Sequence, residues 1–264
     1  RIQGLEQSGP GHPLPWSKSM SSAELPAERL PAPGTAYGLG IGPGEPDLIT
    51  LKAYNILQKA DVIAYPALED GVSLARQIVD PHIPEGRIEI AIRIEMGKPA
   101  DPIYDAAAIE IGKHLADGKT VAVLCEGDPF FYGSFMYLFG RLAEAGHPVK
   151  TVPGVSSMMA CAAQLGAPLA AKNDVLQVIP GPLEADRLRE QLAKTDAAAI
   201  IKLGRHFAKV RDVIDELGLT DRARYIERAT LETQKMVPLG ELPSDAKAPY
   251  FSMILIHRRG DAWR

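Results

Sequence analysis

The chain has 264 residues, of which 46% are hydrophobic and 23% are charged, proportions close to those of an average soluble globular protein. This composition excludes an intrinsically disordered chain, a collagen and a coiled-coil rod. The formal net charge of −4 argues against a broad nucleic-acid-binding surface, and no stretch approaches the roughly 18–20 apolar residues of a membrane-spanning helix.

The first 36 residues are rich in proline, glycine and serine and lack hydrophobic periodicity. We therefore predict that residues 1–36 form a flexible segment outside the fold. The sequence begins at Arg1 and its first methionine is Met20. We expect residues 1–19 to be vector-derived or left by processing, with native translation from Met20; a natural flexible tail is the alternative.

The rest of the chain alternates strands with helices, which predicts an α/β fold of two domains, residues 37–168 and 169–264, built on largely parallel sheets. In the first domain Asp47 is expected to N-cap the first helix. The expected strands are Tyr37–Ile41, Val62–Tyr65, Ile88–Ile94, Thr120–Cys125 and Val149–Val152. The expected helices are Leu48–Ala60, Ser73–Val79, Asp105–Ala116, Tyr132–Ala145 and Ser156–Leu165.

The second domain is expected to begin after a hinge at Leu165–Asp174, where Gly166, Pro168 and Asn173 interrupt the periodic pattern. Its expected strands are Val175–Ile179, Ala198–Leu203, Arg224–Glu227 and Tyr250–His257, and its expected helices are Leu183–Lys194 and Phe207–Leu217.

A glycine-rich loop, Gly38–Asp47, leaves the first strand at the edge where ligands bind in open α/β sheets. It fits neither the dinucleotide nor the triphosphate pattern, because no GxGxxG register closes and no GK[ST] is present. Pro43 offers no N–H to a phosphate, and Glu45 and Asp47 would repel one. The loop therefore favours a ligand that is neutral or cationic where it touches; a purely structural turn is the alternative.

Two further loops leave strand ends in the same way. Glu126–Ser134 follows the most buried strand, with Gly127 allowing close backbone approach and Asp128 adding negative charge; a plain helix N-cap is the alternative for Asp128. Val152–Ser157 places serine hydroxyls at the start of a helix. Together the three loops predict one cleft that suits a small cationic ligand better than a polyphosphate.

The combination of GLGIGPGEPDLIT at 38–50, EGDPFFYGSF at 126–135 and VPGVSS at 152–157 resembles the tetrapyrrole (corrin/porphyrin) methylases. In that family the three motifs occur in this order at about this spacing. The resemblance implies two α/β domains flanking a cofactor cleft, as in class III methyltransferases, with S-adenosylmethionine folded in the cleft and S-adenosylhomocysteine as product. It also implies a cytoplasmic homodimer that methylates a meso carbon of a reduced tetrapyrrole, a small-molecule substrate, during cobalamin biosynthesis.

Carried over by motif position, the resemblance implies a set of cofactor-binding residues, with no catalytic acid or base assigned. They are Pro43, Gly44, Gly127, Asp128, Pro129, Tyr132, Gly133, Ser156, Ser157, Leu203, Gly204, Ala229 and Thr230. The substrate carries several carboxylates, for which basic side chains near the cleft are suited. The candidate substrate-binding residues are Asp47, Glu126, Arg93 and Lys98.

Cys125 and Cys161, the only cysteines, lie in apolar surroundings without a metal-binding pattern. We interpret them as buried thiols in a reducing compartment and expect no metal site, no nucleic-acid partner and no membrane association.

Three alternatives remain open at this stage. Related folds methylate ribosomal RNA or a modified histidine on a protein, although RNA would call for a basic face. The third alternative is a non-catalytic nucleotide sensor, but the lack of a phosphate-binding loop argues against it.

Overall fold

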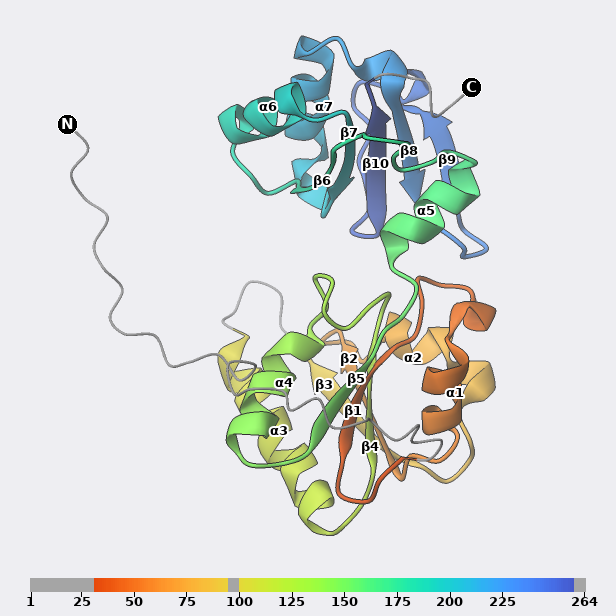
Figure 1. Ribbon diagram of the computed structural model, residues 1–264, viewed down its shortest axis with the longest axis vertical. Coiled ribbons are helices and arrows are strands. Elements are labelled where there is room, and N and C mark those ends of the chain that lie inside the picture. Colours follow the sequence, from red (N-terminus) through yellow and green to blue (C-terminus); the bar gives the residue numbers. More distant parts are fainter. Residues whose placement is uncertain (1–30, 95–99, 259–264) are drawn as a thin grey trace, which may run out of the picture.

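A computed structural model describes residues 31–94 and 100–258, which form two lobes, each built around its own five-stranded sheet (Figure 1). Lys98 and residues 1–30 lie outside the described residues. Within the described ranges, no helix has the length and apolar character needed to cross a membrane.

The sheet of the first lobe is entirely parallel, with the strand order β3-β2-β4-β1-β5. Every residue of β1 and β4 is buried, as the continuous apolar pattern at Thr120–Cys125 predicts for central parallel strands. In β3, by contrast, Ile90 and Ile92 are buried while their neighbours are exposed, so one face of this strand is open to solvent. The strands are β1 (Ala36–Gly40), β2 (Val62–Ala67), β3 (Ile88–Arg93), β4 (Val121–Cys125) and β5 (Val149–Val152).

Four helices cover the two faces of this sheet, with α1 and α2 on one side and α3 and α4 on the other (Figure 1). Phe135 at the start of α4 packs so closely on β1 that a Cβ at Gly38 would lie 2.2 Å from its ring. The helices are α1 (Leu51–Leu57), α2 (Leu74–Ile78), α3 (Asp101–Ala116) and α4 (Phe135–Glu144).

Two local predictions in this lobe are wrong. The N-cap of α1 is Thr50, whose hydroxyl accepts a hydrogen bond from Ala53 N, whereas Asp47 lies in a preceding 3₁₀ helix, η2 (Pro46–Leu48). Strand β2 also continues through Pro66, where we expected it to stop. Proline is tolerated there because the pairing of β2 with β4 ends at Ala64, which leaves that side of the strand without a ladder partner.

The second lobe has the strand order β6-β7-β10-β8-β9. Only β6 and β7 pair in parallel; the other pairs are antiparallel, so the expectation of a largely parallel sheet is wrong for this lobe. Strand β9 was not predicted from the sequence. The strands are β6 (Leu176–Pro180), β7 (Ala197–Ile201), β8 (Ala223–Glu227), β9 (Lys235–Pro238) and β10 (Ser252–His257).

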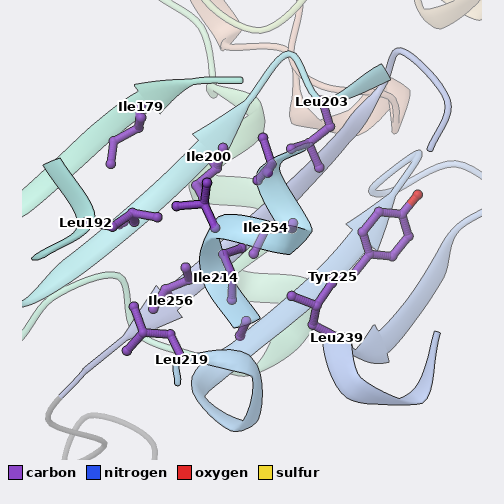
Figure 2. Close-up of a cluster of buried hydrophobic side chains, with 14 of the residues drawn as sticks. Ile179, Leu192, Ile200, Leu203, Ile214, Leu219, Tyr225, Leu239, Ile254 and Ile256 are labelled. Atoms are coloured by element: carbon purple, nitrogen blue, oxygen red, sulfur yellow. The ribbon is translucent and has the colours of Figure 1, made fainter. Parts of the chain in front are cut away.

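Helices α6 (Ala185–Lys194) and α7 (Phe207–Glu216) pack on one face of this sheet. Figure 2 shows the resulting core, in which Ile200 and Ile254 from the central strands meet Ile214 of α7. At the end of β10, buried His257 pairs with Asp174 through Nε2 and Oδ2, 2.9 Å apart.

Helix α5 (Ser157–Leu165) covers the other face of the second sheet (Figure 1). Its apolar residues Met158 and Cys161 join a buried cluster with residues of β7, β8 and β10. The chain therefore passes between lobes at residues 153–156, before α5, and not at the expected hinge Leu165–Asp174. The pattern of α5 predicts an apolar face but does not specify which sheet buries it.

Part of the segment assigned to the N-terminal tail belongs to the first lobe. Gly34 N donates to Gly118 O, Val121 N donates to Thr35 O, and Ala36 N donates to Pro148 O, at 3.0–3.1 Å. Thr35 is buried, and Ala36 opens β1. The fold therefore begins before residue 37.

We expect two truncated chains, one starting at Pro31 and one at Tyr37, to differ in stability. The shorter chain loses the three backbone hydrogen bonds above, each worth about 1 kcal/mol. Its melting temperature, measured by circular dichroism, should be several degrees below that of the chain starting at Pro31. Equal melting temperatures would show that residues 31–36 contribute nothing to the fold.

Candidate functional site

The three glycine loops meet at one edge of the first sheet, because they leave the adjacent strands β4, β1 and β5 at their carboxyl ends. Gly42 and Gly127 pair as an isolated antiparallel bridge, in which Gly127 N donates to Gly42 O at 2.8 Å. The expectation that the three loops come together is therefore confirmed.

The contact between these loops leaves no room for side chains. A Cβ built on Gly154 would lie 2.1 Å from Gly127 O, and one on Gly40 would lie 2.4 Å from Gly154 N. Both distances are far below van der Waals contact, and Gly127 also has a φ of +66°. The glycines thus let three backbone segments stack directly on one another.

Asp128 fastens the second loop to the third. Its Oδ1 accepts a hydrogen bond from Phe130 N at 2.9 Å, and its Oδ2 accepts one from Gly154 N at 3.0 Å. Helix α4 begins only at Phe135, so the alternative of Asp128 as a plain helix N-cap is wrong.

The remainder of the second loop is equally tight. A Cβ on Gly133 would lie 2.5 Å from Pro129 O and 2.8 Å from Asp128 O, while Pro129 itself is buried. Tyr132 is different: its side chain is 45% exposed and its backbone is left-handed, with a φ of 57°. The loop therefore presents Tyr132 outward from a compact turn.

The second lobe reaches the first glycine loop through residues 229 and 230. Thr230 Oγ1 accepts a hydrogen bond from Glu45 N at 2.9 Å, and a Cβ on Gly44 would lie 2.7 Å from that same hydroxyl. Thr230 has a φ of 68°, and its own N–H donates to Gln234 Oε1 at 2.7 Å. The structure thus brings Gly44 close to Ala229 and Thr230. All three residues are expected to bind the cofactor, as is Pro43, which precedes Gly44.

Other expected cofactor positions lie around this contact. Ser156 stands at the N-cap position of α5 next to Gly127, and Ser157 is exposed. Gly204 opens the 3₁₀ helix η4 (Gly204–His206). Leu203 is fully buried and packs in the core of the second lobe, so it offers no exposed surface to a ligand in this structure.

The candidate substrate residues are more scattered. Asp47 is exposed in η2. Arg93 lies at the end of the outermost strand, β3, where it donates to Glu69 O at 3.1 Å. Glu126, at the end of β4, is the one whose carboxyl group is perturbed: burial raises its pKa above the ordinary value, partly offset by hydrogen bonds from its own N–H and that of Ala75.

The charge of the loops fits a cationic ligand. The segments 38–47, 126–133 and 152–157 contain no lysine or arginine, and their charged side chains, Glu45, Asp47, Glu126 and Asp128, are all acidic. In the part of the chain that the structure describes, no group of three or more histidine, cysteine, aspartate or glutamate residues could hold a metal ion. Cys125 and Cys161 are buried, and burial raises the pKa of both thiols to about 12.

The sequence did not single out Lys202, although the structure places it at this site. Its ammonium lies over the Tyr132 ring, 4.9 Å from the centroid, and so joins the two lobes. The sequence offers one signal for Lys202, its position directly after a buried strand and next to Leu203 and Gly204. No pattern in the sequence predicts that its ammonium contacts Tyr132.

Comparison with known proteins gives a consistent result. A family model described as Tetrapyrrole (Corrin/Porphyrin) Methylases matches residues 35–243. The precorrin-2 C(20)-methyltransferase of Sinorhizobium sp is 39% identical over 84% of this chain and 95% of its own length. The cobalamin biosynthesis protein CobIJ of Mycobacterium bovis is 37% identical over 86% of this chain, which spans 46% of that protein. The cobalt-precorrin-2 C(20)-methyltransferase of Salmonella typhimurium is 30% identical over 86% of this chain and 97% of its own length.

Solved structures share the two-lobed fold. A cobalt precorrin-4 methyltransferase superposes with a TM-score of 0.64 and 25% identity, covering 85% of this chain and 95% of its own. A uroporphyrin-III C-methyltransferase from Thermus thermophilus, complexed with S-adenosylhomocysteine, gives a TM-score of 0.64 and 23% identity over 84% of this chain and 92% of its own. The predicted α/β fold of two domains is therefore confirmed.

We expect Gly154→Ala to weaken S-adenosylhomocysteine binding by at least about tenfold, because the new methyl group must push the third loop away from Gly127 O. Gly140→Ala is the matched control, since Gly140 lies in α4 with nothing within 4 Å of the added Cβ. Isothermal titration calorimetry gives both affinities. Wild-type affinity in the Gly154 variant would contradict the role assigned to this contact.

We expect Glu126→Gln to change how stability depends on pH. Since folding raises the pKa of Glu126 above 4.5, the folded state binds its proton more tightly, and the carboxyl group destabilises the fold increasingly as pH rises above that value. The unfolding free energy of the variant should match that of wild type at about pH 4 and exceed it at about pH 7. Urea titrations at both pH values, with Glu85→Gln as an exposed control, measure the difference; a constant offset would refute the expectation.

Proposed function

Because the chain belongs to the tetrapyrrole (corrin/porphyrin) methylase family, whose methyl donor is S-adenosylmethionine, we propose that it methylates C20 of precorrin-2 in cobalamin biosynthesis. The products are precorrin-3A and S-adenosylhomocysteine. The observation that carries the ring position is the identity of 39% with a precorrin-2 C(20)-methyltransferase across both lobes. The segment EGDPFFYGSFMYL at 126–138 supports it, since members acting at other ring positions usually differ after GDP.

The cleft has the features that the methyl donor needs. Gly44 and Gly133 lie where their neighbours leave no room for a side chain, and Gly127 has a left-handed φ of +66°, so glycine at these positions keeps the loops compact at the edge of the sheet. Bound there, S-adenosylmethionine supplies an electrophilic methyl group on a positively charged sulfur. Carbonyl oxygens and the carboxylate of Asp128 favour that charge, whereas the lack of basic residues in the loops disfavours a polyphosphate.

The chain contributes mainly by positioning the reactants. A reduced tetrapyrrole is electron-rich, so its meso carbon acts as the nucleophile, the carbon–sulfur bond breaks as the new carbon–carbon bond forms, and the meso carbon then loses a proton. Holding the two partners in line can supply up to roughly 7–11 kcal/mol of the barrier reduction. The glycine contacts and the hydrogen bonds of Asp128 fix the three loops, so that these loops can hold the two reactants in line.

The aromatic residues after the GDP turn take different positions. Phe131 packs with the cluster that buries α5, whereas Phe130 is 51% exposed and lies edge-on to Phe139, with ring centroids 5.3 Å apart. Phe130 and Tyr132 are therefore the aromatic side chains of this turn that are open to a macrocycle, and we assign them to its placement.

The names of the relatives give two forms of the substrate, precorrin-2 and cobalt-precorrin-2. Identity is higher with the precorrin-2 enzyme, at 39%, than with the cobalt-precorrin-2 enzyme, at 30%, which favours the metal-free substrate. A ribosomal RNA acceptor is disfavoured by the net charge of −4.

The test is turnover of precorrin-2 and cobalt-precorrin-2, side by side, with methyl-¹³C-labelled S-adenosylmethionine. We expect one labelled methyl group, assigned by NMR to C20, and faster turnover of the metal-free substrate. Label at C11, C17 or a pyrrole carbon would refute the ring position but leave the family's chemistry intact. Faster turnover of the cobalt form would reverse the choice of substrate, and no transfer to either would refute the proposal.

A further inference from the structure

Two residues from opposite lobes meet beside the glycine loops in unusual backbone conformations. Tyr132 precedes α4 in the first lobe, and Lys202 directly follows β7 in the second. Their φ angles are 57° and 56°, in the left-handed region that residues other than glycine rarely adopt. Such strained positions cluster at functional sites, where the side chain is needed despite the cost to the backbone.

The contact that they make is a cation–π interaction. The Lys202 ammonium lies 4.9 Å from the centroid of the Tyr132 ring, and both residues are exposed. At an exposed site this attraction is weak, so a carboxylate, which forms a charge-assisted hydrogen bond with an ammonium, can displace it. The ring therefore holds the lysine at the cleft without neutralising its charge.

Lys202 differs in this respect from the basic residues that lie in short ion pairs. Arg76, Arg141, Arg189 and Lys194 lie in ion pairs with carboxylates at 2.5–2.9 Å. Across residues 31–94 and 100–258, Lys202 has no carboxylate within ion-pair distance. It thus brings an uncompensated positive charge to a cleft whose glycine loops carry no lysine or arginine.

We propose that the Lys202 ammonium binds a peripheral carboxylate of the tetrapyrrole, with Tyr132 holding it in place until the substrate arrives. This assignment rests on the proposed function, which supplies a substrate bearing several acetate and propionate groups. The first lobe then binds the cationic methyl donor, and the second lobe binds the anionic acceptor. Lys202 fixes the macrocycle in the cleft and takes no part in bond making.

The test compares Lys202→Met, which keeps the length of the side chain but removes its charge, with Lys202→Arg, which keeps the charge. Lys113→Met is the matched control, because Lys113 is an exposed lysine in the last turn of α3, at the opposite edge of the sheet. For each variant we would measure kcat and KM with precorrin-2 at two salt concentrations, the Kd of S-adenosylhomocysteine, and the Kd of uroporphyrin III as a polycarboxylate probe.

Lys202→Met is expected to raise KM for precorrin-2 and the Kd of uroporphyrin III by about tenfold, and to flatten the salt dependence of both. Lys202→Arg should retain most of the affinity, while kcat and the Kd of S-adenosylhomocysteine stay near wild type in both variants.

Two results would overturn the assignment of Lys202 while leaving the proposed function standing. One is a wild-type KM and salt dependence in Lys202→Met; the other is an equal loss of S-adenosylhomocysteine and porphyrin binding, which indicates a structural role. A wild-type protein that binds S-adenosylhomocysteine but neither binds nor methylates a tetrapyrrole would overturn both proposals.

Discussion

The site depends on the direct stacking of backbone at the carboxyl edge of the first sheet. Gly40, Gly127 and Gly154 approach within distances that no Cβ permits, and the Asp128 carboxylate holds the arrangement by accepting Gly154 N–H. Because β4, β1 and β5 are adjacent, three loops far apart in sequence become one surface. Because these loops contain no basic residue, they favour a cationic ligand over a phosphate.

The second lobe completes this surface with a different chemistry. Thr230 accepts a hydrogen bond from Glu45 N on the first glycine loop, and Lys202 reaches Tyr132 on the second. Thr230, Lys202 and Tyr132 all have positive φ angles, so these two contacts between the lobes are made by loops in uncommon conformations. A mixed sheet with helices on both faces provides the rigid support that such loops need.

Much of the first lobe could be predicted from the sequence, because buried parallel strands such as Val121–Cys125 appear as unbroken apolar runs. Tertiary context decided what the sequence left open. The apolar face of α5 fits either sheet, and the N-cap of α1 is Thr50 where Asp47 was expected. The positions of the glycine loops could be predicted from the spacing of their motifs. The contact of Lys202 with Tyr132 could not, because it depends on how the two lobes meet.

The path of the chain between the lobes has a mechanical consequence. Helix α5 is buried against the second sheet, yet it begins at Ser157, three residues after Gly154 in the glycine contact. Any rigid-body rotation of the second lobe therefore carries α5 with it and pulls on the third loop. Val155 and Ser156 are then the covalent link through which a movement of the second lobe reaches the glycine contact.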